Sequence, residues 1–201
     1  MKLEKLISEL KIIDIRNNQP ECDIKKICYN SREVVPGSLF VAIPGYVTDG
    51  HQYIGKAISQ GAVAVVHQDD LTDYQTGVSY IKVADSRHAL GLLGSCFYGK
   101  PSASMVVTGI TGTNGKTSLT YMLKHIFETE GKKCGLIGTI HNLIGDQVVD
   151  NRGRTTPESL EVQEIINEMK ERGCSHLFME VSSHGLALDR VNGVEFDYGI
   201  F

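Results

Sequence analysis

The chain has 201 residues, of which 41% are hydrophobic and 22% are charged, and its formal net charge at pH 7 is −4. This length allows one large or two modest domains, each with its own core, and two domains fit the pattern better. Because no basic run occurs, the composition argues against nucleic acids and membrane surfaces as partners. We therefore expect a small-molecule ligand.

Hydropathy and cysteine content bear on the compartment. No segment approaches the roughly 20 apolar residues that a membrane helix needs, and the N-terminus is a charged amphipathic segment rather than a signal peptide. The cysteines are odd in number and widely spaced, and no metal-ligand spacing links them. We expect a cytoplasmic protein with buried, reduced thiols at Cys22, Cys28, Cys96, Cys134 and Cys174.

The first half of the chain predicts short strands mixed with short helices. Apolar residues at helical spacing predict a helix over residues 2–10. Apolar runs broken by Pro-Gly turn signals predict strands at 24–29, 38–43, 62–66 and 78–83, with helices at 53–60 and 86–98. Gly99 and Pro101 are stop signals, so we predict a small mixed α/β domain over residues 1–100.

In the second half, strands and helices alternate. The predicted elements are a strand at 104–109, a helix at 117–130, a strand at 134–139, a helix at 157–172 and a strand at 175–181. This alternation is typical of a doubly wound, mostly parallel sheet, here over residues 101–201. Gly131 and Gly173 should end the two helices in the left-handed conformation. Residues 141–154 are expected to form a hairpin or a mobile loop.

The end of the chain also predicts something about its extent. Residues 196–201 resemble the middle or end of a buried strand and have no polar tail. Because termini are usually exposed and polar, we expect that residues follow Phe201 and that the second domain is incomplete.

The most informative segment is a glycine-rich loop between the strand at 104–109 and the helix at 117–130. Its residues are Gly112, Thr113, Asn114, Gly115, Lys116, Thr117 and Ser118. Glycines let backbone N–H groups surround a phosphate, a lysine adds positive charge, and the threonine hydroxyl can ligate Mg²⁺. The loop departs from the usual template, because Ile110 stands where a glycine is expected and Gly109 lies one residue early. An ordinary surface turn is the alternative, but the flanking strand and helix favour nucleoside triphosphate binding.

Several segments together resemble one known family. In the first half they are Tyr29–Gly45, Thr48–His51 and Gly61–Val66, and in the second they are the phosphate loop, Thr155–Ser159 and Met179–Leu186. Over essentially the whole chain, these segments resemble the Mur ligases, and within that family the MurE type. The segment with Ser31, Arg32 and Pro36–Ala42 is shared with the MurF type, whereas Thr155–Glu158 and Glu180–His184 favour the MurE type.

The resemblance implies a role for each domain. Domain 1–100 would bind a uridine nucleotide through Tyr29, Ser31, Tyr46, Val47 and Thr48, although Ser31 can also be read as a plain turn residue. Domain 101–201 would bind ATP and Mg²⁺, with Lys116 and Glu180 as catalytic groups and Thr117 and Glu180 as metal ligands.

The resemblance also implies how the acceptor is held. Thr155, Thr156, Ser182 and Arg190 would bind the muramoyl-peptide portion, with hydroxyls and a guanidinium meeting sugar and carboxylate oxygens. The Thr155–Glu158 segment can equally be read as a helix start with a hydroxyl cap and an early proline. Both roles are compatible.

The implied activity is an ATP-dependent acid–amino-acid ligation in peptidoglycan precursor synthesis. An acyl phosphate would form on UDP-N-acetylmuramoyl-L-alanyl-D-glutamate, and an amino acid, diaminopimelate or lysine, would attack it. The parent enzyme is expected to be a monomer, and this 201-residue piece is expected to be inactive alone. Two alternatives stay open: a MurF-type or folylpolyglutamate-type ligase, and a regulatory nucleotide-binding module.

Overall fold

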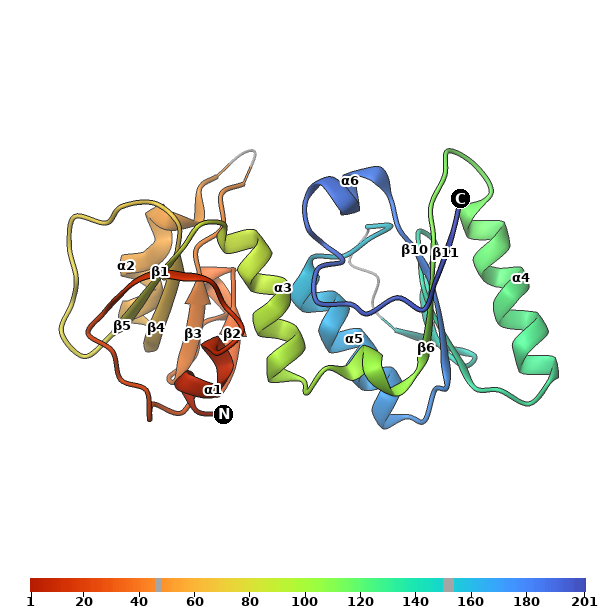
Figure 1. Cartoon of the computed structure of the whole chain (residues 1–201), viewed down its shortest axis with the longest axis horizontal. Helices are drawn as coiled ribbons and strands as arrows, with labels where there is room; N and C mark the ends of the chain where they lie inside the picture. The colour runs from red at the N-terminus through yellow and green to blue at the C-terminus, as the bar shows by residue number, and fades with distance from the viewer. Residues whose placement is uncertain (46–47, 150–153) are drawn as a thin grey trace. The chain divides into compact units, whose positions relative to one another are not determined.

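The computed structural model describes residues 1–45, 48–149 and 154–201. The chain forms two compact units, Met1–Leu93 and Gly94–Phe201, each with its own sheet (Figure 1). The division falls inside one helix, α3 (Ser86–Phe97). The longest described helix has 14 residues, and none in the described part of the chain combines the length and the apolar character needed to cross a bilayer.

The first unit is built on a five-stranded sheet in the order β1-β5-β4-β3-β2. The pairs from β2 to β5 are parallel, and β1 pairs antiparallel with β5. The strands are β1 (Ile12–Arg16), β2 (Lys26–Cys28), β3 (Ser38–Val41), β4 (Ala62–His67) and β5 (Ser79–Val83). The helices are α1 (Leu3–Ile7), α2 (Ile54–Ser59) and the first part of α3, with 3-10 turns η1 (Ser31–Glu33) and η2 (Gly50–Tyr53).

The core of the first unit lies on both faces of this sheet. Phe40, Val65 and Tyr80 from the strands belong to one buried cluster with Ile54 and Ala57 of α2. The alternate positions along β3 and β4 are buried as well. Parallel strands covered on both faces read as continuous apolar runs, which is why the strand predictions succeeded in this region.

The second unit has a six-stranded sheet in the order β11-β6-β10-β7-β8-β9. The first four strands of this order are parallel, and β8 and β9 add an antiparallel hairpin. The strands are β6 (Val106–Ile110), β7 (Cys134–Ile137), β8 (Asn142–Ile144), β9 (Gln147–Val149), β10 (His176–Glu180) and β11 (Tyr198–Ile200). The helices are α4 (Lys116–Thr129), α5 (Ser159–Glu171), α6 (Ser183–Ala187) and the 3-10 turn η3 (Pro101–Ser104).

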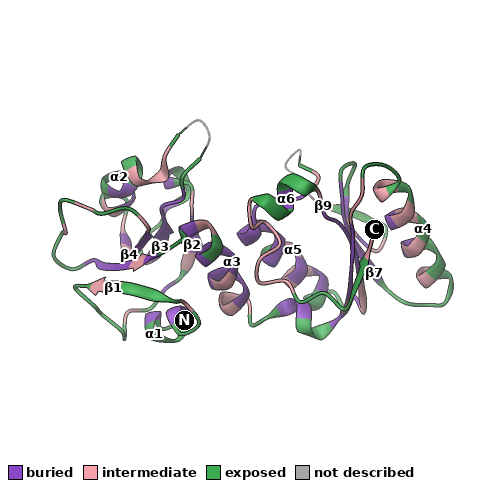
Figure 2. Cartoon of the chain, turned by 45° about the horizontal axis from the view of Figure 1, so that its top comes forward, coloured by how far each residue is buried: buried purple, intermediate pink, exposed green. Residues whose placement is uncertain are grey.

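Helices α4 and α5 cover opposite faces of the second sheet (Figure 1). The central strand β10 contributes to both cores, because its successive side chains point to opposite faces. Phe178 packs with Phe127 of α4, with ring centroids 5.3 Å apart, and Met179 belongs to the buried cluster that contains Ile166 of α5. Figure 2 shows the strands of this unit largely buried, while the outer side of α4 is exposed.

The predicted fold class is confirmed: both units are α/β, and the second has a mostly parallel sheet with helices on both faces. The left-handed conformations predicted for Gly131 and Gly173 are present, with φ of 75° and 79°. The free thiols are also confirmed; Cys28, Cys134 and Cys174 are buried, whereas Cys22 and Cys96 are only partly buried.

Other expectations need correction. Strand β1 has no counterpart in the pattern analysis; it is a short strand at the edge of the sheet, and its Ile12 and Ile13 are exposed. The strand near the end of the chain exists as β11, but it lies at an edge of the sheet with Tyr198 63% exposed, not in a buried position. The hairpin expected within 141–154 is formed by β8 and β9, and residues 150–153 lie outside the described part.

Candidate functional site

The phosphate loop joins β6 to α4 at the carboxyl edge of the second sheet. Gly112 and Gly115 have φ of 128° and 83°, a region that disfavours residues with a Cβ. Gly115 is the N-cap of α4, so the loop turns its backbone directly into a helix N-terminus. Unpaired N–H groups at such a terminus attract anions. Thr113, Asn114 and Ser118 are exposed beside it.

Lys116 folds back over this loop. Its Nζ donates to the carbonyl oxygen of Gly112 at 2.7 Å and to that of Thr113 at 3.4 Å. Two neutral carbonyl oxygens are weaker partners for an ammonium group than phosphate oxygens. The lysine is therefore placed to exchange these contacts for a bound anion without rearranging the fold.

Glu180 lies opposite Thr117, at the end of the neighbouring strand β10. Parallel pairing sets Glu180 beside Ile110, the last residue of β6, so the carboxylate and the loop share one edge of the sheet. The residue is 1% exposed, and its Oε2 accepts a hydrogen bond from the Thr117 hydroxyl at 3.0 Å. A carboxylate and a hydroxyl in contact beside a phosphate loop fit Mg²⁺, which prefers hard oxygen ligands and nucleotide phosphates.

Thr139, two residues after β7, is a member of this site that the sequence analysis missed. Its backbone N–H donates to Oε1 of Glu180 at 3.0 Å, and its hydroxyl oxygen lies 3.0 Å from Oε2. The same hydroxyl oxygen lies 3.0 Å from Oγ1 of Thr155. The signal that could have found it is its place at the carboxyl end of a parallel strand.

The predicted acceptor residues Thr156 and Ser182 lie side by side. Their hydroxyl oxygens are 3.2 Å apart, and Thr156 Oγ1 also accepts the Ser182 backbone N–H at 3.1 Å. Ser182 is the N-cap of α6 and its hydroxyl accepts the Gly185 N–H at 3.0 Å. Thr156 and Ser182 thus have structural hydrogen bonds of their own, as Thr155 has with Thr139.

Arg190 has a partner that the sequence analysis also missed. Its Nε donates to Oε1 of Glu158 at 2.6 Å, and its Nη1 donates to the carbonyl oxygen of Thr156 at 3.1 Å. The Glu158 side chain is only 5% exposed. The guanidinium is therefore held beside Thr156 by a buried carboxylate, and among the described residues its other N–H groups are left to meet an anion.

The helix start predicted at Thr155–Glu158 was wrong in detail. Helix α5 begins at Ser159 and its N-cap is Glu158, whose backbone N–H donates to the side chain of Glu161 at 3.1 Å. Pro157 precedes the cap instead of occupying the first turn. A Glu–Glu capping box takes the place of the expected hydroxyl cap.

The residues predicted to bind uridine lie in the first unit. Ser31 begins η1 and is buried, and Tyr29 directly follows β2. Thr48 is exposed and its carbonyl oxygen accepts the Gly45 N–H at 3.1 Å. Tyr46 and Val47 lie outside the described residues.

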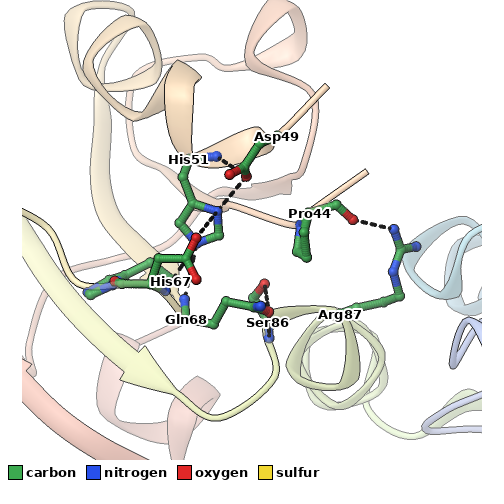
Figure 3. A network of polar contacts seen from close by, with 8 residues as sticks. Pro44, Asp49, His51, His67, Gln68, Ser86 and Arg87 are labelled. Carbon is green, nitrogen blue, oxygen red and sulfur yellow. Dashed lines mark hydrogen bonds and ion pairs between the residues drawn. The ribbon is translucent and has the colours of Figure 1, made fainter. Parts of the chain in front are cut away.

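Asp49 and His51, which come shortly after Thr48 in the sequence, belong to a network of polar contacts (Figure 3). Nε2 of His51 accepts the backbone N–H groups of Gln68 and Asp69, at 3.2 and 3.4 Å. Nδ1 must then hold the ring proton, and it donates to Oδ1 of Asp49 at 2.6 Å. Burial of Asp49 favours its protonated form, but the two hydrogen bonds from His51 outweigh this effect and lower the pKa of Asp49.

Potential metal ligands cluster at the same place. In the described part of the chain, Asp49, His51 and Asp69 place their ligand atoms within 4.8 Å of one another. Because both ring nitrogens of His51 are already used, neither offers a lone pair to a cation. Instead, these hydrogen bonds connect the start of η2 to the residues that follow β4, and they fix the position of the segment after Thr48.

Comparisons with known proteins agree for both units. Residues 23–98 match the family described as Mur ligase, catalytic domain, and residues 110–201 match the Mur ligase middle domain. Proteins from Alkaliphilus metalliredigens and Caldanaerobacter subterraneus are 48% and 47% identical over the whole chain. Both are named UDP-N-acetylmuramoyl-L-alanyl-D-glutamate–2,6-diaminopimelate ligase, and the chain spans only 40% and 41% of their lengths.

Solved structures give the same fold. One of a UDP-N-acetylmuramoyl-L-alanyl-D-glutamate–2,6-diaminopimelate ligase aligns with a TM-score of 0.79 at 22% identity, covering 99% of this chain and 40% of that one. A MurF structure from Acinetobacter baumannii aligns with a TM-score of 0.63 at 22% identity, covering 90% of this chain and 36% of that one.

Proposed function

The chain belongs to the Mur ligase family, and from this premise we propose that it is the nucleotide- and acceptor-binding part of a MurE-type ligase. The whole protein would join 2,6-diaminopimelate to UDP-N-acetylmuramoyl-L-alanyl-D-glutamate with ATP as the energy source. The names of the relatives that are 47–48% identical support this acceptor and this amino acid.

One observation supports the proposal most strongly. Residues expected to bind the nucleotide and residues expected to bind the acceptor are joined by a continuous series of contacts, Thr117 to Glu180, Glu180 to Thr139, and Thr139 to Thr155. A ligase must bring an acceptor carboxylate to the γ-phosphate of ATP, so its two sites must adjoin. A regulatory nucleotide-binding module has no such need.

The two units would divide the binding work. The second unit, expected as domain 101–201, would bind ATP through Gly112–Ser118, with Thr117 and Glu180 as the Mg²⁺ ligands. The first, expected as domain 1–100, would bind the uridine nucleotide near Tyr29, Ser31 and Thr48. Geometry supports the assignment of ATP to the second unit, whereas the family supports the assignment of the uridine nucleotide to the first unit.

The reaction would proceed in two steps. An oxygen of the acceptor carboxylate attacks the γ-phosphorus of ATP, the bond to the bridging oxygen breaks, and an acyl phosphate and ADP result. The amine of the incoming amino acid then attacks the acyl carbon, loses a proton and expels inorganic phosphate.

This chain's residues would lower the charge repulsion in the first step. Lys116 would move from its two carbonyl partners to the phosphate oxygens, and the N–H groups at the start of α4 would hold the transferring group. Thr155, Thr156, Ser182 and Arg190 would hold the acceptor so that its carboxylate approaches in line. Mg²⁺, when bound, neutralises phosphate charge.

Calorimetric titration of the chain with Mg²⁺-ATP and, separately, with UDP-N-acetylmuramoyl-L-alanyl-D-glutamate tests the proposal. We expect both to bind. Lys116→Ala should weaken Mg²⁺-ATP binding about tenfold or more, because a charge-assisted contact is lost, and should leave the uridine ligand unaffected.

The matched control is Lys132→Ala, which removes an exposed lysine far from the loop and should change neither affinity. Equal loss of both ligands in Lys116→Ala would contradict the division of labour. Binding of the muramoyl tripeptide in preference to the dipeptide would favour a MurF-type ligase instead.

A further inference from the structure

Thr139 contacts both Glu180, the expected metal ligand, and Thr155, an expected acceptor residue. It follows β7, whereas Thr117 lies in the first turn of α4, Glu180 ends β10 and Thr155 precedes α5. Its backbone N–H and its hydroxyl group meet different oxygens of the same carboxylate, Oε1 and Oε2 of Glu180, each at 3.0 Å. Two contacts on one carboxylate fix both its position and its rotation.

The hydroxyl of Thr139 has two possible acceptors for its proton. It has one proton but lies 3.0 Å from both Glu180 Oε2 and Thr155 Oγ1. An ionised carboxylate accepts only, and it is the stronger acceptor of the two. The single proton of Thr139 therefore favours Glu180 Oε2 over Thr155 Oγ1, and the two hydroxyl oxygens of Thr139 and Thr155 stay in contact at 3.0 Å.

The residues around the Glu180 carboxylate restrict the positions that it can take. Glu180 is 1% exposed, and a Cβ on Gly138 would lie 2.5 Å from its Oε1, so this oxygen fits against bare backbone. The Thr117 hydroxyl also donates to Oε2, at 3.0 Å. With Mg²⁺ held by Thr117 and Glu180, Thr139 would still orient the carboxylate through its backbone N–H and its hydroxyl.

We propose that Thr139 is a positioning residue that holds Glu180 ready for the metal–nucleotide complex and connects it to Thr155 in the acceptor site. This inference rests on the proposed function, because it assigns Glu180 to Mg²⁺ and Thr155 to the acceptor. When the acceptor fixes the position of Thr155, the Thr139 hydroxyl would in turn fix the position of Glu180.

The test measures the affinity of the chain for ADP by calorimetry, with Mg²⁺ and with EDTA. The ratio of the two affinities is the magnesium enhancement. Thr139→Val removes the hydroxyl but keeps shape and backbone N–H, and should lower the enhancement about fivefold to tenfold while leaving ADP binding in EDTA unchanged. Thr139→Ser keeps the hydroxyl and should stay within about twofold of the wild type.

Thr129→Val is the matched control, because its hydroxyl donates to the carbonyl oxygen of Ile126 in its own helix, at the far end of α4. Glu180→Gln tests the proposed function independently, and should abolish the enhancement. If Glu180→Gln leaves the enhancement intact, or the wild type binds no ADP, the proposed metal site fails and the role of Thr139 fails with it.

The remaining outcomes concern Thr139 alone. If Glu180→Gln abolishes the enhancement but Thr139→Val leaves it intact, or weakens ADP binding equally in EDTA, Thr139 is not a positioning residue. The link to Thr155 predicts that Thr155→Val lowers the enhancement in the wild type and has no further effect in Thr139→Val. Full additivity of the two substitutions would overturn the link.

Discussion

Replacing Gly138 by alanine should disturb the site through a single steric contact. Gly138 lies between the end of β7 and Thr139, and its φ is outside the left-handed region, so alanine can adopt its backbone conformation. The new Cβ would lie 2.5 Å from Oε1 of Glu180, whereas real Cβ contacts essentially never fall below 3.0 Å. The carboxylate must therefore shift by about 0.5 Å or more.

The loss of stability in Gly138→Ala can be estimated from the hydrogen bond that Oε1 of Glu180 accepts. Oε1 accepts the Thr139 N–H at 3.0 Å, and the carboxylate is 1% exposed, so water cannot replace a weakened bond. A hydrogen bond to a charged group contributes about 1.5–3 kcal/mol. We expect the second unit to lose about 2 kcal/mol of unfolding free energy, or about 8–12 °C in Tm for a unit of about 100 residues.

Scanning calorimetry measures the Tm, and titration with Mg²⁺-ADP measures the site. Gly199→Ala is the control, because a Cβ at this position meets nothing within 4 Å and should change stability by less than about 0.5 kcal/mol. We expect Gly138→Ala to lower both the Tm and the magnesium enhancement. Wild-type values for both would show that the Glu180 carboxylate does not lie against Gly138, and would refute the geometry of the site.

Three further predictions follow from single residues. Burial lowers the pKa of His67 in the folded chain. As the pH falls, the unfolded chain therefore takes up the proton first, near pH 6.5. The stability that His67 contributes is complete above that pH and is lost as the pH falls through the lower pKa of the folded chain. The Tm of His67→Asn should therefore fall less between pH 7.5 and 5.5 than that of the wild type, and an equal fall would contradict this. Burial, with a smaller contribution from Glu128, raises the pKa of Cys134 to about 11, so only about one thiol in a thousand is ionised at pH 8. Iodoacetamide should label Cys134 in urea but not in the native chain, as peptide mass spectrometry can check. Arg190→Ala should destabilise the second unit by about 3 kcal/mol because it leaves Glu158 buried without this partner, whereas Arg190→Lys should cost less; urea unfolding that is unchanged in Arg190→Ala would refute the pairing.

The sequence predicted the parts of the site that local patterns encode. The phosphate loop needs two glycines, a lysine and a threonine in sequence between a strand and a helix, and this order is visible in residues 105–123. Glu180 was predicted as a metal ligand from the family resemblance, and it lies at the end of the strand predicted at 175–181. Parallel pairing then brings it beside the loop, as the register of β10 and β6 confirms.

The missed residues depend on contacts between distant segments. Thr139 reaches Glu180 across 41 positions, and Glu158 meets Arg190 across 32. Neither pair has a local signature, because a threonine after a strand or a glutamate before a helix is common. Strand β1 was missed for a different reason: Asp14 interrupts Ile12, Ile13 and Ile15, so neither a continuous apolar run nor a regular alternation marks this short segment.

The most direct test of the account is to observe which backbone amides of the chain respond to each ligand by NMR. We predict that Mg²⁺-ATP shifts the amides of 112–118 and Thr139, and that UDP-N-acetylmuramoyl-L-alanyl-D-glutamate shifts amides near Ser31 and Thr48 in the first unit. No response of residues 112–118 to Mg²⁺-ATP, or a response confined to the first unit, would contradict the assignment of the ATP site.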